Sequence, residues 1–144
     1  MKKVYLAAPF FNELELKNMW YVADLLQKSN YDVYIPQKLK IKNAWNMSNK
    51  EWSKAVFEED IKALNMADNV VLMNYGMNMD SGTAWEGGYA FAKSIPVLNI
   101  CFKNNTNSLM LINSSYAQIY FDDLLKMDKI NIDQIDSFLN EEQK

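Results

Sequence analysis

The stretch that decides the fold is the apolar run Asn69-Val-Val-Leu-Met73 followed by Asp80-Ser-Gly-Thr-Ala-Trp-Glu86-Gly-Gly88. The apolar run predicts a buried strand, and the second segment predicts a glycine-containing turn that opens a helix. Two carboxylates, those of Asp80 and Glu86, lie six residues apart across this turn. A strand, a short loop and a helix with an acid in its first turns is how open α/β sheets build a ligand site.

The rest of the chain repeats the alternation of strand and helix. Four further apolar runs predict strands, at residues 3–8, 31–35, 95–102 and 117–120. Apolar residues at helical spacing predict helices over residues 13–28, 48–66, 83–93 and 108–115, and a helical tail to about residue 139. Because the connections are short, we predict an α/β fold: a flavodoxin-like, doubly wound sheet of about five parallel strands with helices on both faces, in a single domain of residues 1–144.

The helix predicted at residues 48–66 begins with a capping box, in which the side chains of Ser48 and Glu51 each accept from the other's backbone amide. Its apolar positions are Trp52, Ala55, Val56, Phe57, Ile61 and Leu64. The lysine- and asparagine-rich residues 37–47 that precede this helix predict an ordered loop over the site.

The composition limits the classes of function. The chain of 144 residues is 49% apolar with a net charge of −3, which gives no reason to expect nucleic acid or an anionic membrane as a partner. The single cysteine cannot form an internal disulfide, and no apolar stretch suits a signal peptide or a membrane span, so we expect a cytoplasmic protein. All 15 basic residues are lysines, and the absence of arginine, the usual bidentate partner of phosphate, disfavours a phosphorylated substrate.

Two nucleotide-binding motifs are missing from the sequence. No GxGxxG follows the first predicted strand and no GxxxxGK[ST] is present, so neither a dinucleotide site nor a P-loop is expected. We predict no cofactor and assign no metal ligands. Because the chain has no histidine, acid–base or nucleophilic chemistry must fall on carboxylates, tyrosines, lysines or Cys101.

Glu86 is the strongest candidate for chemistry. It lies near the N-terminal end of its predicted helix, where the dipole and the spare amides favour the ionised carboxylate. An ionised glutamate held firmly, with a tyrosine nearby, can act as a nucleophile toward an electrophilic carbon. The alternative is an ordinary surface glutamate. Against it, Gly87 and Gly88 follow, and a helix that accepts two adjacent glycines usually has something packed closely against its backbone.

The other candidates have structural alternatives that the residues alone leave open. Asp80 is also a common turn former, and Asp60 lies in an acidic run that often marks a solvated helix face, although it borders apolar positions. Tyr5 lies inside a predicted strand, where a core role is the usual one. Phe10 and Phe11 either cover the edge of the core or stack on a flat base.

Three segments together resemble a known family. They are Val4-Tyr-Leu-Ala-Ala-Pro-Phe-Phe-Asn12, Glu59-Asp-Ile61 and Asp80-Ser-Gly-Thr-Ala-Trp-Glu-Gly-Gly-Tyr89. They look like the nucleoside 2-deoxyribosyltransferases, and the likeness extends from the first strand to the Ser108-Leu-Met110 segment. The resemblance implies an enzyme that moves a 2-deoxyribosyl group between nucleobases, with a 2′-deoxynucleoside and a free nucleobase as its partners.

The resemblance also implies catalytic roles for three residues. Glu86 is the nucleophile that attacks the anomeric carbon and forms a deoxyribosyl ester, so that two inversions retain the β configuration. Tyr5 orients Glu86 through its hydroxyl. Asp60 faces the base and helps to protonate it as it leaves, which requires a raised pKa.

Further residues are implied to bind the substrate, by contacts within the chain or across a subunit boundary. Asp80 holds a sugar hydroxyl, Phe11 and Phe10 line the base pocket, and Gln37 is the nearest match to a glutamine after the second strand. In the family an asparagine from a neighbouring subunit, in an Asn-x-Met segment, completes the sugar site. The match here is Ser108-Leu-Met110, with Asn107 one position earlier. Either Ser108 or Asn107 takes the role beside Met110, and a homo-oligomer is implied.

Two other functions stay open on the sequence alone. One is a hydrolase of the same fold that cleaves the N-glycosidic bond of nucleosides or nucleoside 5′-monophosphates with water as acceptor. The other is a non-catalytic sensor of nucleotides or bases on the same scaffold, which fold-level reasoning does not exclude.

Overall fold

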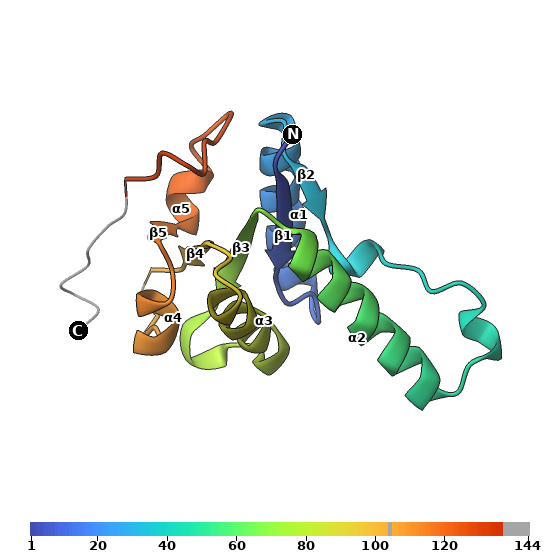
Figure 1. Cartoon of the computed structure of the whole chain (residues 1–144). Coiled ribbons are helices and arrows are strands. Elements are labelled where there is room, and N and C mark those ends of the chain that lie inside the picture. The colour runs from blue at the N-terminus through green and yellow to red at the C-terminus, as the bar shows by residue number, and fades with distance from the viewer. Residues whose placement is uncertain (104, 137–144) are drawn as a thin grey trace.

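The computed structural model describes residues 1–103 and 105–136, whose five strands form one sheet (Figure 1). The strands are β1 (Lys3–Ala7), β2 (Asp32–Tyr34), β3 (Asn69–Asn74), β4 (Val97–Cys101) and β5 (Ala117–Tyr120). Their order across the sheet is β2-β1-β3-β4-β5, and every neighbouring pair is parallel. The apolar runs of the sequence thus fall on the strands, as buried strands of a parallel sheet require.

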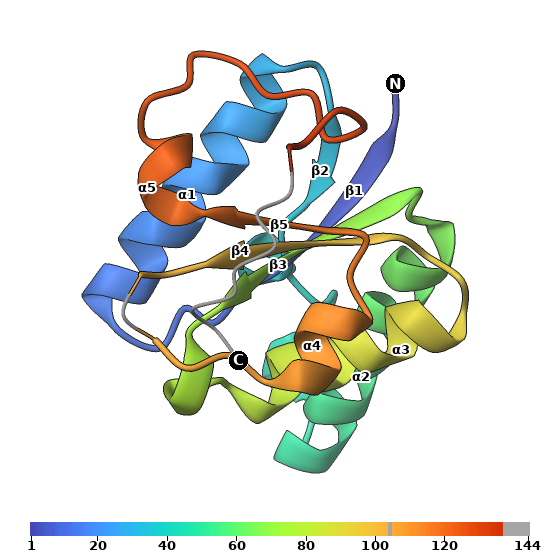
Figure 2. The ribbon, with the colours of Figure 1, turned by 90° about the vertical axis from the view of Figure 1, so that its left-hand side faces the viewer.

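Helices cover both faces of this sheet. They are α1 (Glu13–Lys28), α2 (Asn49–Met66), α3 (Ser81–Ala92), α4 (Leu109–Asn113) and α5 (Phe121–Leu124), with single 3-10 turns η1 (Pro36–Lys38), η2 (Ala44–Asn46) and η3 (Gly76–Asn78). Figure 2 shows α1 and α5 on one face and α2, α3 and α4 on the other. The predicted fold class is confirmed. Among the described residues, no helix is both long enough and apolar enough to cross a bilayer.

The face covered by α1 and α5 holds the larger core. The Asn12 side chain caps α1 by accepting from the backbone amide of Glu15, which starts the helix where the sequence predicts it. The α1 residues buried against the sheet are Met19, Val22, Ala23, Leu25 and Leu26. They pack on the strand residues that point to this face, such as Leu6, Met73 and Leu98.

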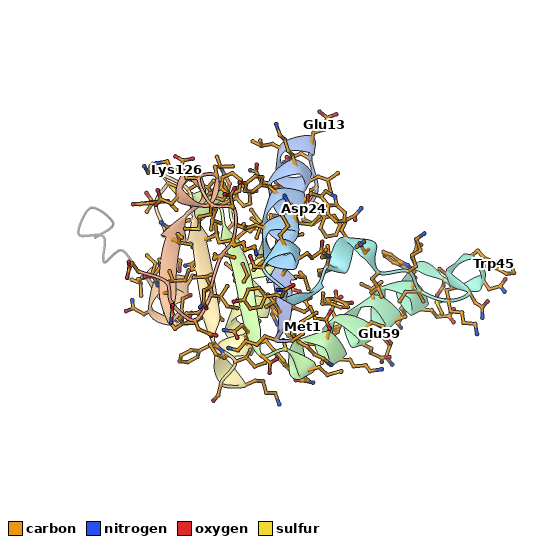
Figure 3. The ribbon with its side chains drawn as sticks, turned by 90° about the horizontal axis from the view of Figure 1, so that it is seen from above. Met1, Glu13, Asp24, Trp45, Glu59 and Lys126 are labelled. Carbon is orange, nitrogen blue, oxygen red and sulfur yellow. The ribbon has the colours of Figure 1, made fainter. Side chains whose placement is uncertain are left out.

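The other face is covered less completely. The capping box at Ser48 and Glu51 forms as predicted. However, Leu64 is the one residue of α2 that is buried, and no residue from 36 to 63 is. Figure 1 shows the start of α2 and the loop before it projecting from the sheet, and Figure 3 places Trp45 at the far end of this projection. Most of the apolar positions of α2 are therefore not buried in the core of this chain.

The predicted helical tail is also wrong where it can be compared. Helix α5 ends at Leu124, and residues 125–136 contain no helix. Instead, Ile130 and Ile132 enter the α1-side core, and their backbone amides donate to side-chain oxygens of Ser29 and Tyr31. Burial of β-branched side chains, with their amides satisfied by side chains, outweighs the local helical pattern. The part of this prediction beyond residue 136 lies outside the described residues.

Candidate active site

A cavity of about 380 Å³ lies beyond the carboxyl ends of β1 and β3. The loop after β1, one side of α2 and the start of α3 form its walls. Three carboxylates line it, those of Asp60, Asp80 and Glu86. The structure thus brings Asp60, from the middle of the chain, together with Asp80 and Glu86 at the edge where open parallel sheets bind ligands.

Glu86 lies on α3 and is held by a tyrosine from the sheet. The Tyr5 hydroxyl, on β1, donates a hydrogen bond to Oε2 of Glu86. Tyr5 is fully buried, so packing fixes the ring that carries this donor. Packing and this hydrogen bond therefore fix Oε2 of Glu86.

Burial also controls the protonation of Glu86. It raises the pKa of Glu86 to about 7; the Tyr5 hydrogen bond lowers this pKa, and the carboxylates of Asp60 and Asp80 raise it. The prediction that the helix N-terminus favours the ionised form is wrong in its net direction, because lost hydration outweighs the dipole. A carboxyl group with this pKa exists in both forms near neutral pH, which suits a catalytic group.

Asp60 has a tyrosine partner of its own. The Tyr34 hydroxyl, at the end of β2, donates to Oδ1 of Asp60 at 2.9 Å. Burial raises the pKa of Asp60, the Tyr34 hydrogen bond lowers it and the neighbouring Glu59 raises it. The net direction is the one that a general acid requires.

Asp80 both caps a helix and lines the cavity. It is the N-cap of α3: its Oδ2 accepts from the backbone amide and from the hydroxyl of Thr83, both at 2.9 Å. Asp80 also lines the cavity. A turn former in the sequence is thus a fixed hydrogen-bond acceptor in the site.

The two glycines after Glu86 differ in the space around them: Gly87 has no room for a side chain, and Gly88 has. A Cβ at Gly87 would lie 2.6 Å from Cδ1 of Leu72 on β3, so α3 approaches the sheet closely there. A Cβ at Gly88 would meet nothing within 4 Å. The predicted close packing is therefore correct at Gly87 and wrong at Gly88.

Aromatic rings form the rim of the cavity. Phe10 and Phe11 stack on each other, with centroids 5.8 Å apart and 17° between the planes. Phe57 and Trp85, which sequence reasoning did not assign to the site, also line the cavity and meet edge to face at 5.6 Å. Their positions carried a signal, because Trp85 directly precedes Glu86 and Phe57 lies about one helical turn before Asp60.

Four predicted site residues lie away from this cavity. Gln37, Asn107, Ser108 and Met110 are not among the described residues that line it. Asn107 is 7% exposed, and its side-chain oxygen and nitrogen have no hydrogen-bond partner within the described part of the chain. Ser108 is exposed and caps α4 by accepting from the Met110 amide, and Met110 is 72% exposed. This chain alone therefore does not bring these side chains to the three carboxylates.

Comparison with known proteins identifies the family of this chain. The family model for nucleoside 2-deoxyribosyltransferase matches residues 4–140. A search of curated protein sequences finds no match.

Solved structures share the fold over most of the chain. A 2-deoxyribosyltransferase from Bacillus psychrosaccharolyticus is 28% identical with a TM-score of 0.76, over 91% of this chain and 93% of that one. A CMP N-glycosidase from Clostridium botulinum is 18% identical with a TM-score of 0.63, over 88% and 99%. A 2-desoxiribosyltransferase from Leishmania mexicana is 21% identical with a TM-score of 0.55, over 80% and 73%. The last two likenesses concern the fold alone.

The family match spans nearly the whole chain and includes all three carboxylates of the cavity. This chain therefore belongs to the nucleoside 2-deoxyribosyltransferase family and is a glycosyl-transferring enzyme.

Proposed function

We propose that this enzyme transfers the 2-deoxyribosyl group between nucleobases through a covalent ester on Glu86, with retention of configuration. The observation that carries the proposal is the Glu86 carboxylate, clamped at Oε2 by Tyr5 and facing a cavity that Asp60 and Asp80 also line. A held carboxylate beneath a sugar ring stabilises an oxocarbenium-like transition state and then captures it.

In the first half-reaction, Oε1 of Glu86 bonds to the anomeric carbon as the bond from that carbon to the base nitrogen breaks. The bonding electrons leave with the base, and Asp60 donates a proton to it. Asp80, fixed as the cap of α3, accepts a hydrogen bond from a sugar hydroxyl. Phe10 and Phe11 stack on the base, and their exposed rings leave room for one base to replace another.

In the second half-reaction, a nitrogen of the incoming base attacks the same carbon from the opposite side to Glu86. The ester bond breaks, its electrons return to the Glu86 carboxylate, and the proton of the incoming base passes to Asp60. Each proton and electron pair is thereby restored. The mechanism requires an ionised Glu86 and a proton on Asp60 when the base leaves, and burial raises the pKa of Asp60, which favours that proton.

The charge of the cavity favours nucleosides over nucleotides as substrates. Its described lining residues include three carboxylates and neither lysine nor arginine. The N-terminus of α3, where a phosphate group could find free amides, is capped by the Asp80 carboxylate. A 5′-phosphate would therefore meet negative charge without a compensating cation.

The exposed apolar surface supports an oligomer in which a neighbour completes the site. Trp45, Trp52 and Phe57 on the projecting segment are 83%, 48% and 47% exposed. Such a concentration of large apolar side chains marks an interface. Exposed Ser108 and Met110 are better placed than buried Asn107 to enter a neighbouring cavity, where they would help to exclude water from the ester.

A base-exchange assay tests the proposal. Incubation with deoxyinosine and free adenine is expected to yield deoxyadenosine and hypoxanthine. Free deoxyribose and hypoxanthine, with no deoxyadenosine, would instead establish the N-glycosidic hydrolase. A parallel incubation with deoxyinosine 5′-monophosphate is expected to show much slower turnover.

The covalent step has its own test. With a slow substrate such as a 2′-fluorinated deoxynucleoside, mass spectrometry of the quenched enzyme is expected to show one added sugar on the peptide that contains Glu86. A label on Asp80 or Asp60 would contradict the assigned roles.

A further inference from the structure

Tyr34 belongs to a pair of tyrosines that the sheet holds side by side. In the parallel pairing of β1 with β2, Tyr5 and Tyr34 are register partners, so their side chains leave the same face of the sheet. Their rings stack with centroids 5.2 Å apart and 19° between the planes. The two hydroxyl groups are therefore carried by one rigid unit rather than by two independent side chains.

Each tyrosine of this pair holds one carboxylate of the site. Tyr5 donates to Glu86 on α3, and Tyr34 donates to Asp60 on α2 at 2.9 Å. Neither ring is among the described residues that line the active-site cavity; both line a second cavity of about 260 Å³. The tyrosines therefore reach a ligand through the carboxylates that they hold.

Asp60 depends on this contact more than Glu86 does. Glu86 lies on a helix that approaches the sheet closely at Gly87, whereas Asp60 lies on the part of α2 where no residue is buried. Within residues 1–103 and 105–136, Tyr34 is the hydrogen-bond partner that the structure gives the Asp60 side chain. Without it, the carboxyl group would be free to rotate about its side-chain bonds.

We propose that Tyr34 is a positioning residue for the proposed reaction: it fixes Oδ1 of Asp60 and thereby directs Oδ2, with its proton, toward the base. The proposal rests on the function proposed above for Asp60. Because Tyr34 already donates to Oδ1, a proton on the carboxyl group is carried by Oδ2, the oxygen left for the nitrogen of the leaving base. Tyr34 thus fixes which oxygen acts and where that oxygen lies.

The substitution Tyr34→Phe tests this role because it removes the hydroxyl and retains the stacked ring. We expect kcat to fall by about tenfold, less than the 10²–10⁴-fold typical of losing a general acid. Asp60→Asn is expected to show that larger loss, and Tyr34→Phe should cause no further loss in the Asp60→Asn background. The matched control is Tyr21→Phe, which removes a hydroxyl that donates to the Leu124 carbonyl on the α1 side of the sheet.

The pH dependence separates positioning from a merely structural role. The ionisable groups around Asp60 are Tyr34 on β2, Glu59 on its own helix, and Glu86 and Tyr5 on α3 and β1. The Tyr34 hydrogen bond lowers the pKa of Asp60. Its removal should therefore move the alkaline limb of the kcat profile to higher pH, while Tyr21→Phe leaves the limb in place.

The outcomes are distinct. The proposal is supported if Tyr34→Phe shifts the alkaline limb of the kcat profile and causes no further loss of kcat in the Asp60→Asn background. An unshifted limb, or an equal loss with and without Asp60, overturns it. Both deoxyadenosine and free deoxyribose should be measured in the same reactions, so that the two proposals are tested separately. If only free deoxyribose forms, transfer is refuted. The effect of Tyr34→Phe on the alkaline limb can still be measured from the rate at which the N-glycosidic bond is cleaved.

Discussion

Helices α1 and α2 have similar sequence patterns but are buried to different extents. Both are amphipathic and both begin with a side-chain cap. On α1 the apolar stripe is buried against the sheet, while on α2 Leu64 alone is buried and Trp52 and Phe57 stay about half exposed. An apolar stripe therefore predicts that something covers it, and it does not say whether that is the chain's own core, a ligand or another subunit.

The two faces of the sheet differ in the same way. On the α1 side the core is formed by apolar side chains, with few polar groups to satisfy. The other side carries the raised pKa of Glu86, an open cavity and the buried amide of Asn99, which has no hydrogen-bond partner within the described residues. The α1 side thus holds the larger apolar core, and the other side combines a smaller apolar core with the cavity.

The largest expected effect that distinguishes the two faces is on turnover. Replacing Glu86 with Gln removes the proposed nucleophile while keeping the shape of the side chain, so base exchange is expected to fall by roughly 10⁴-fold or more. The control is Glu13→Gln in the first turn of α1, which is expected to keep activity within about twofold. Initial rates of deoxyadenosine formation measure both. Comparable losses of activity in the two variants would show that turnover does not depend specifically on the face that carries the cavity.

The next effect in size is on stability. Leu26 is 1% exposed in the α1-side core, and Leu26→Ala is expected to lower the free energy of unfolding by about 2–5 kcal/mol. Trp52 is 48% exposed, so Trp52→Ala is expected to cost under about 1 kcal/mol in the dilute chain. Urea denaturation compares the two.

The same Trp52→Ala variant should differ from the wild type in self-association. If a second copy covers the projecting segment, sedimentation velocity will show weaker assembly for Trp52→Ala and unchanged assembly for folded Leu26→Ala. A loss of unfolding free energy from Trp52→Ala as large as that from Leu26→Ala would mean that α2 is part of the core after all.

Local patterns predict the fold well because each strand is decided within a few residues. The final strand is observed at Ala117–Tyr120 as predicted, and the others differ from the prediction only at their ends. The tail fails because Ile130 and Ile132 are held by Ser29 and Tyr31, about a hundred residues away in the chain. No local periodicity contains that information.

The features of the site also divide into those set by local sequence and those set by the assembled fold. Asp80 and Glu86 lie on one loop and helix, so their spacing predicts their proximity. The partnership of Tyr34 with Asp60 depends on the register of β2 with β1 and on the path of α2 across the sheet, neither of which a single sequence states. The direction of the Glu86 pKa was likewise set by burial, which is a property of the assembled fold.

The pH dependence of stability sharpens the contrast between the faces. Glu86 has a pKa of about 7 in the folded chain and an ordinary value of 4.5. A carboxyl group that binds its proton more tightly when folded contributes stability that is complete below pH 4.5 and is lost as the pH rises through 7. At pH 8 the ionised group therefore costs on the order of 3 kcal/mol.

Glutamine cannot ionise, so Glu86→Gln should unfold at higher urea than the wild type at pH 8, and the difference should shrink toward pH 5. Glu13→Gln again serves as the control and should follow the wild type at both values. A difference that is constant with pH would show that Glu86 is hydrated in the folded chain.

The smallest expected effects come from the glycine pair on α3, which tests how closely the functional face is packed. At Gly87→Ala the new methyl group would lie 2.6 Å from Leu72 Cδ1, so the helix or the leucine must move, at a cost of about 1–3 kcal/mol. At Gly88→Ala the methyl group meets nothing within 4 Å, and the gain in helix propensity should stabilise the chain by about 0.5–1 kcal/mol. Thermal unfolding of the two variants measures opposite signs at adjacent positions. If both substitutions stabilise the chain, the Leu72 side chain moves easily and α3 is not fixed against β3. Glu86 would then lack the rigid support that the proposed chemistry requires.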